Sequence, residues 1–230
     1  MKDFSPFEKK VSIRFANQDL IQQAFTHRSY LNENKHFQGG HNERLEFLGD
    51  AVLELVTTEY LYFAYPEKTE GDLTSYRAAL VNTYSLATIA GEIGMDEYLL
   101  LSRGEAKDTG RARQFILANT FEALVGALYL DQGYEAAKQF IGTHLLPRTE
   151  EIVAKRLWQD AKSRFQELIQ EKHGVTPTYD TIKEEGPDHD RQFTVCVYVD
   201  GECVAEGGGK SKQEAEQDAA QKALKKHGSA

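Results

Sequence analysis

Three carboxylates recur at helical spacing in the segment that begins at His41. On a helix of about 100° per residue, Glu43, Glu46 and Asp50 fall within a sector of roughly 60°. Like charges at this spacing destabilise a helix by roughly a few tenths of a kcal/mol per pair, so their convergence calls for a compensating cation. Oxygen ligands of this kind suit hard divalent ions such as Mg²⁺. The spacing therefore predicts a metal-binding face, and an ordinary solvated acidic face is the alternative.

A second set of oxygen-bearing side chains lies further along the chain. Asn119 and Glu122 are three residues apart in a predicted helix, so both point to one face. Their side-chain oxygens are candidates to complete the same metal site. Glu70 is a further carboxylate, beside Gly71 at an expected helix start.

Two kinds of hydrophobic pattern divide the chain. From residue 20 to about 157, apolar residues recur every three or four positions, which predicts helices nearly throughout. After Trp158 we expect a helix at about 161–173, alternating strand residues at 193–199, a tight turn at Asp200-Gly201, a strand at 202–206 and a helix at about 211–226. The sequence thus predicts an all-α domain at 1–152, a linker at 153–158 and an α+β domain with the order α-β-β-β-α at 159–228.

The charge balance limits the classes of partner. The 230 residues include 27 Lys and Arg against 36 Asp and Glu, a net charge of -9, which argues against binding nucleic acid by bulk charge. Any nucleic-acid contact therefore requires local cations. No apolar run of about 18 residues predicts a membrane span, and the first residues do not resemble a secretion signal. The two cysteines, Cys196 and Cys203, are expected to be reduced diagonal neighbours, and a cytoplasmic location follows.

The segment from Asn42 to Asp50 resembles the signature of the ribonuclease III family. Further matching segments follow the family's order: Thr26-His27-Arg28-Ser29, Glu70-Gly71-Asp72-Leu73, Arg77 to Asn82, Phe121-Glu122-Ala123-Leu124 and Gly126-Ala127. The resemblance implies an all-α endonuclease domain that forms a homodimer and a double-stranded RNA-binding domain. It also implies Mg²⁺-dependent cleavage, with Mn²⁺ as a substitute ion and no small-molecule cofactor. The products would carry 5′-phosphate and 3′-hydroxyl ends with short 3′ overhangs, in rRNA and mRNA processing.

The same resemblance implies roles for individual residues. Glu46, Asp50 and Glu122 would bind the principal metal ion, with Asn119 at the fourth ligand position. Asp50 and Glu122 would be catalytic, while Glu43 and Glu70 would recruit a second ion or contact the scissile strand.

Asn119 departs from the family pattern, which normally has Asp at this position. An amide offers one neutral oxygen where a carboxylate offers two charged ones, so we expect weaker metal binding. Three interpretations remain open: a natural variant that still cleaves, a substitution introduced to slow catalysis, and a natural RNA-binding protein with impaired or no cleavage.

Three segments of the second domain are candidate contacts with duplex RNA. One lies on a polar helix face, one in the loop between the first two strands, and one at the start of the last helix. Side chains at such places can bind the hydroxyls of the minor groove and the phosphates. The residues are Ser163, Gln166 and Glu167 on the helix, His189 in the loop, and Lys210, Ser211 and Lys212 at the helix start.

Overall fold

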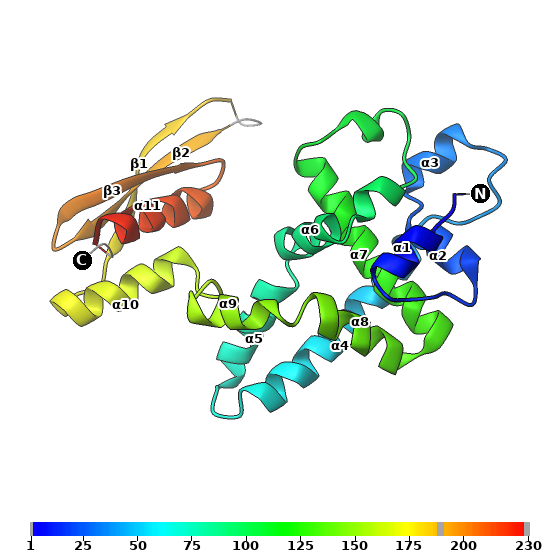
Figure 1. The fold of residues 1–230 in the computed structure, drawn as a ribbon. Helices are drawn as coiled ribbons and strands as arrows, with labels where there is room; N and C mark the ends of the chain where they lie inside the picture. Colours follow the sequence, from blue (N-terminus) through cyan, green and yellow to red (C-terminus); the bar gives the residue numbers. More distant parts are fainter. Residues whose placement is uncertain (1, 188–190, 228–230) are drawn as a thin grey trace. The chain divides into compact units, whose positions relative to one another are not determined.

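The computed structural model describes residues 2–187 and 191–227, which form two compact units that meet in the sequence between Trp158 and Gln159. The first unit is built from helices, as the periodicity predicted, and its one strand-like pairing among the described residues is an isolated bridge between Thr26 and Leu100. Figure 1 labels its α-helices. They are α1 (Ser5–Lys10), α2 (Gln18–Ala24), α3 (Arg28–Glu33), α4 (Glu43–Ala64), α5 (Glu70–Leu80), α6 (Thr83–Glu92), α7 (Arg111–Gln132), α8 (Tyr134–His144) and α9 (Arg148–Ala154), with 3-10 turns at Met95–Tyr98 and Glu105–Lys107.

Helix α7 forms the centre of the first unit. Its residues 116–118, 120–121 and 123–128 are all buried, so it is covered on several sides by neighbouring helices. Aromatic side chains complete this core, with the rings of Phe121 and Phe140 5.6 Å apart.

Helices α4 and α7 cross at a pair of glycines, Gly49 and Gly126. A methyl group on Gly49 would overlap the carbonyl oxygen of Glu122, and one on Gly126 would overlap that of Leu45. The two backbones therefore touch without intervening side chains, a contact that only glycine permits. This crossing fixes the distance between the helix faces that carry the candidate site.

The end of the first unit is ordered by an aromatic contact. Helix α9 ends at Ala154, within the segment expected to be a linker, and Trp158 packs against the core of this unit. Its ring lies 5.0 Å from that of Tyr76 on α5. Residue 158 therefore belongs structurally to the first unit.

The second unit has the predicted α-β-β-β-α order. Helix α10 (Ala161–His173) is followed by β1 (Thr178–Glu185), β2 (Gln192–Val199), β3 (Glu202–Gly209) and α11 (Lys212–His227). The strands form an antiparallel sheet in the order β1-β2-β3. Figure 1 shows the two helices beside this sheet, and Phe165, Val197 and Ala219 belong to the core that they share.

The hairpin turn between β2 and β3 confirms the prediction, but the strand after it is longer than the predicted 202–206. Asp200 and Gly201 both have positive φ, as a tight primed turn requires. Strand β3 continues to Gly209, so the three glycines from Gly207 pair with β2 and do not form a flexible loop. A methyl group on Gly207 would overlap the backbone nitrogen of Ala219, which explains why glycine occupies this strand position.

The expectation of reduced cysteines is wrong. Cys196 and Cys203 form a disulfide, with their Cα atoms 6.0 Å apart. They are diagonal neighbours across the hairpin, where an irregularity in register lies between Val197 and Tyr198. At this Cα separation, diagonal neighbours lie within bridging range.

A helix that spans a bilayer must be both long and apolar. No helix in the described part of the chain meets both requirements.

Candidate functional site

The α4–α7 crossing brings together three carboxylates, Glu46, Asp50 and Glu122, which we call the acidic cluster. Burial, followed by the charges of Asp50 and Glu46, raises the pKa of Glu122 to about 8. Burial and the charges of Glu43 and Asp50 also raise the pKa of Glu46. These pKa shifts indicate that the carboxylates predicted to form one site lie close enough to affect each other's ionisation.

Asn119 lies one helical turn before Glu122 on α7. Its side chain hydrogen-bonds to Glu46 and lowers the pKa of that carboxyl, partly opposing the effect of burial. An amide lowers a carboxyl pKa by donating to the charged form, so Asn119 acts on Glu46 as a donor. Asn119 thus neighbours the acidic cluster as a donor, whereas an Asp would add a fourth carboxylate.

The chemistry of these side chains fits a hard divalent cation. Carboxylate oxygens are the ligands that Mg²⁺ prefers, and a buried carboxyl group beside two others gains most from a compensating positive charge. Among residues 2–187 and 191–227, no three His, Cys, Asp or Glu side chains are grouped closely enough to hold an ion as they stand. To bind a cation as an anionic ligand, Glu122 would have to lose its proton, because burial and the neighbouring charges raise its pKa to about 8.

Glu43 lies at the first residue of α4, at the exposed edge of the acidic cluster. Its carboxylate is 3.6 Å from Nη1 of Arg28 and 3.8 Å from Nδ1 of His41. The sequence interpretation did not connect Arg28 or His41 with this carboxylate, because they precede α4 and their approach depends on the path of the chain. Arg28 supplies one positive charge at the rim of the site.

The start of α4 is held by the buried Asn42. Its backbone nitrogen donates to the carbonyl of Thr26 at 2.9 Å, and its Nδ2 donates to that of Ala24 at 3.3 Å. Gln23 supports the preceding loop by donating from Nε2 to the carbonyl of His41 at 3.1 Å. These bonds attach the segment carrying Glu43 to α2.

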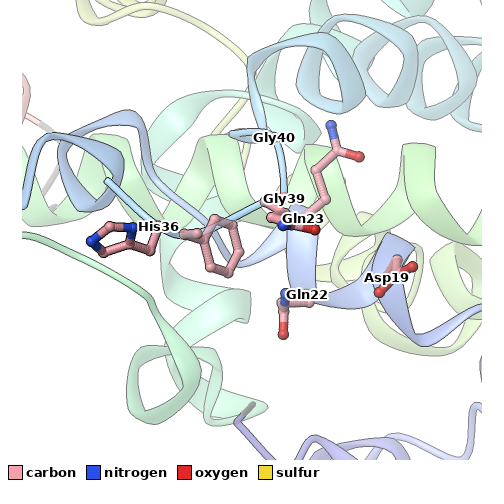
Figure 2. Close-up of a pocket in the computed structure, with 8 residues that line it drawn as sticks. Asp19, Gln22, Gln23, His36, Gly39 and Gly40 are labelled. Atoms are coloured by element: carbon pink, nitrogen blue, oxygen red, sulfur yellow. The ribbon is translucent and has the colours of Figure 1, made fainter. Parts of the chain in front are cut away.

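A polar pocket of about 550 Å³ lies between α2 and the loop before α4. Figure 2 shows Asp19, Gln22 and Gln23 lining one part of it, with His36 and the backbone of Gly39 and Gly40 lining another. The pocket has no signal in the sequence, because its lining comes from two segments that meet only in the fold.

Glu70 lies elsewhere on the first unit. It is the first residue of α5, after the capping residue Thr69, and accepts a hydrogen bond from Oγ1 of Thr74 at 3.0 Å. It borders a hollow with Thr58 and Tyr62, two to three turns of α4 beyond Asp50. The structure therefore does not bring Glu70 beside the acidic cluster.

The candidate RNA-binding residues on α10 are exposed, and two of them have local partners. Ser163 Oγ donates to Asp160 at 2.7 Å, within the cap of α10, and Glu167 accepts from Gln159 at 2.8 Å. Gln166 lies exposed between them. His189 lies outside the described residues.

The start of α11 places Lys210, Ser211 and Lys212 on the surface. Ser211 Oγ accepts a hydrogen bond from the backbone nitrogen of Glu214 at 3.1 Å, and so caps the helix. Lys212 Nζ lies 3.0 Å from Glu184 and 5.8 Å from the centre of the Phe193 ring. The three predicted residues are thus adjacent and accessible.

Family models match both units. A ribonuclease-III-like model covers residues 17–149, and a double-stranded RNA binding motif covers residues 161–227. Ribonuclease 3 of Enterococcus faecalis is 49% identical over 218 residues, which are 95% of this chain and 94% of that protein. The chain belongs to the ribonuclease III family.

Other members and a solved structure agree with this assignment. Ribonuclease 3 of Bacillus licheniformis is 45% identical over 98% of this chain and 90% of its own length. The nuclease domain of ribonuclease III from Campylobacter jejuni superposes with a TM-score of 0.57 at 36% identity, covering 63% of this chain and 99% of that domain. Family membership makes the chain an endoribonuclease, with its helical nuclease domain followed by a duplex RNA-binding motif.

Proposed function

We propose that this chain is a Mg²⁺-dependent enzyme that cuts both strands of duplex RNA, with Mn²⁺ as a substitute ion. Products would carry 5′-phosphate and 3′-hydroxyl ends with short 3′ overhangs, and the substrates would include rRNA and mRNA precursors. The convergence of Glu46, Asp50 and Glu122 at the α4–α7 crossing is the observation that supports the proposal, since these carboxylates are of the kind that would bind a divalent cation.

In the proposed reaction, Glu46, Asp50 and Glu122 would hold the metal, with Asn119 beside Glu46. Bound divalent ions would lower the pKa of the attacking water and stabilise charge on the leaving 3′-oxygen. Glu122 must release its proton before it can act as an anionic ligand, because its pKa lies at about 8. Glu43, at the edge of the acidic cluster, is proposed to recruit a second ion or contact the scissile strand, and Glu70, which lies away from the cluster, is proposed only to contact the strand.

Cutting two strands requires two such sites, and we propose that a second copy of the chain supplies the other. Phe47 is 82% exposed on α4, and Leu55 on the same helix is also exposed. Phe47 adjoins a hollow that includes Leu20, Leu48 and Leu130. The Campylobacter jejuni nuclease domain was described with a region involved in dimer formation, which supports a homodimer here.

A second candidate function is duplex RNA binding with impaired or no cleavage. Asn119 favours it, because its amide donates to Glu46 and adds no negative charge to the acidic cluster. The two functions share the RNA interface and differ only in chemistry at the metal site.

Incubation of the full chain with long duplex RNA and Mg²⁺ separates the two functions. We expect short products with 5′-phosphates, whereas a gel shift without products would support the binding protein and contradict the nuclease. A Glu122→Gln variant should bind RNA like the unmodified chain but lose cleavage. Ca²⁺ in place of Mg²⁺ should likewise preserve binding while suppressing cleavage.

A further inference from the structure

The start of α11 is engaged by the chain's own carboxylates. The backbone nitrogen of Gly208 donates to Asp218 at 2.8 Å, and that of Lys210 donates to Glu214 at 2.9 Å. Backbone N–H groups at a helix start are also the groups that bind phosphate. Two of the N–H groups in this segment are therefore already bonded to carboxylates of the same chain.

A further contact of this kind involves a side chain from the opposite edge of the sheet. Oε1 of Glu184 lies 3.0 Å from Nζ of Lys212. Oε2 of the same carboxylate lies 3.8 Å from Nη1 of Arg191. One carboxylate thus interacts with two cations through its two oxygens.

Strand register explains how Glu184 reaches the start of α11. Glu184 on β1 pairs with Phe193 on β2, and Phe193 pairs with Gly209 on β3. Glu184, Phe193 and Gly209 therefore lie side by side across the sheet, and the Lys212 ammonium lies 5.8 Å from the centre of the Phe193 ring and 3.0 Å from Glu184. Lys212 keeps 59% of its side chain exposed in this position, where RNA can reach it.

We propose that Glu184 competes with RNA phosphate for Lys212 and thereby lowers the affinity of this chain for duplex RNA. The inference rests on the proposed RNA interface at Lys210 to Lys212. A carboxylate and a phosphate both offer anionic oxygens to an ammonium group, so RNA binding exchanges one ion pair for another. In this proposal Glu184 changes the affinity for RNA through Lys212 and does not contact the RNA itself.

Removing the competing charge has a measurable consequence. An exposed ion pair contributes little, so we expect Glu184→Gln to strengthen duplex RNA binding by about two- to fivefold at low salt. The gain should shrink as salt rises, because ions screen the Lys212–Glu184 attraction. The affinity of the Glu184→Gln variant should also fall more steeply with salt than that of the unmodified chain. A lysine freed from its carboxylate displaces more counterions from the RNA when it binds phosphate.

Glu185 provides a matched control. It is the next residue on β1, carries the same charge and pairs with Lys183 at 2.9 Å, a lysine outside the proposed RNA contacts. Glu185→Gln changes the net charge of the chain by the same amount. Comparing the two variants therefore separates local competition from general electrostatic attraction.

The experiment measures dissociation constants of the full chain for a fluorescent RNA duplex, in EDTA, at two salt concentrations. Tighter binding by Glu184→Gln than by Glu185→Gln supports the proposal. Equal binding overturns it, and weaker binding would mean that Glu184 holds Lys212 in place for RNA. If Lys212→Gln binds like the unmodified chain, the proposed contact at Lys212 fails as well. If Lys212→Gln binds more weakly but Glu184→Gln shows no gain, only the competition is overturned.

Discussion

Asn119 determines the charge of the candidate metal site through a single amide. Replacing it with Asp would exchange a donor to Glu46 for a fourth carboxylate, and ligand charge increases affinity for hard cations. We expect Asn119→Asp to reach half-maximal cleavage at several-fold lower Mg²⁺ and to gain more thermal stability from Mg²⁺. Mg²⁺ titrations of cleavage and of melting temperature test this, and superimposable curves for the two proteins would contradict it.

Glu122 should make the stability of the metal-free protein depend on pH. Its carboxyl pKa is raised from 4.5 to about 8 in the folded chain. Between these values the folded state holds more protons than the unfolded state, so the stability contributed by this proton declines as pH rises. In EDTA, the melting temperature should fall more from about pH 5 to pH 8 for the unmodified chain than for Glu122→Gln. Parallel curves would show that Glu122 ionises normally.

The sequence predicted best the relative positions of residues that lie on the same helix. The spacing of Glu46 and Asp50 on α4 predicted their shared face, and Glu122 joins them as expected. The hydrogen bond of Asn119 depends on how two helices cross, so the sequence could not reveal it. The distance of Glu70 from the acidic cluster has the same cause, since it depends on how α5 follows α4.

At the level of elements, the glycine pair at the α4–α7 crossing should be sensitive to substitution. Gly49→Ala would force a methyl group into the carbonyl of Glu122, and we expect the free energy of unfolding to fall by about 3 kcal/mol or more. Gly142→Ala on α8 is the control, because nothing lies within 4 Å of its added methyl group. Chemical denaturation should show the control unchanged or more stable by about 0.5–1 kcal/mol. Equal stabilities of the two variants would disprove close backbone contact.

The elements predicted most accurately are those with local signals. The predicted helix at 161–173 coincides with α10, whose ends carry Asp160 as a cap and Gly174 with positive φ. The predicted strand at 202–206 was too short, because glycines do not favour a strand, whereas those from Gly207 to Gly209 continue β3 and let α11 pack against it. The diagonal placement of Cys196 and Cys203 was predicted, but the disulfide was not, because whether diagonal neighbours come within bridging range depends on the local register of the hairpin.

At the scale of the whole molecule, the proposed homodimer makes Phe47 important beyond its own chain. Burying it against a second copy would stabilise the dimer by about 1.5–3 kcal/mol per phenylalanine, so Phe47→Ser should weaken dimerisation at least about tenfold. Tyr84→Ser is a control with a similarly exposed aromatic residue, 73% accessible on α6. Sedimentation velocity at micromolar concentration measures both variants. A Phe47→Ser protein that remains as dimeric as the control would place the interface elsewhere.

The contact between Trp158 and Tyr76 gives the molecule an optical label. Trp158 is the single tryptophan of the chain, and it packs in the first unit immediately before the second begins. Its fluorescence will therefore report the environment of α5 and the end of the nuclease unit, while the RNA-binding unit contains no tryptophan. Unfolding followed by tryptophan emission and by circular dichroism should diverge if the two units melt separately, because only dichroism observes both.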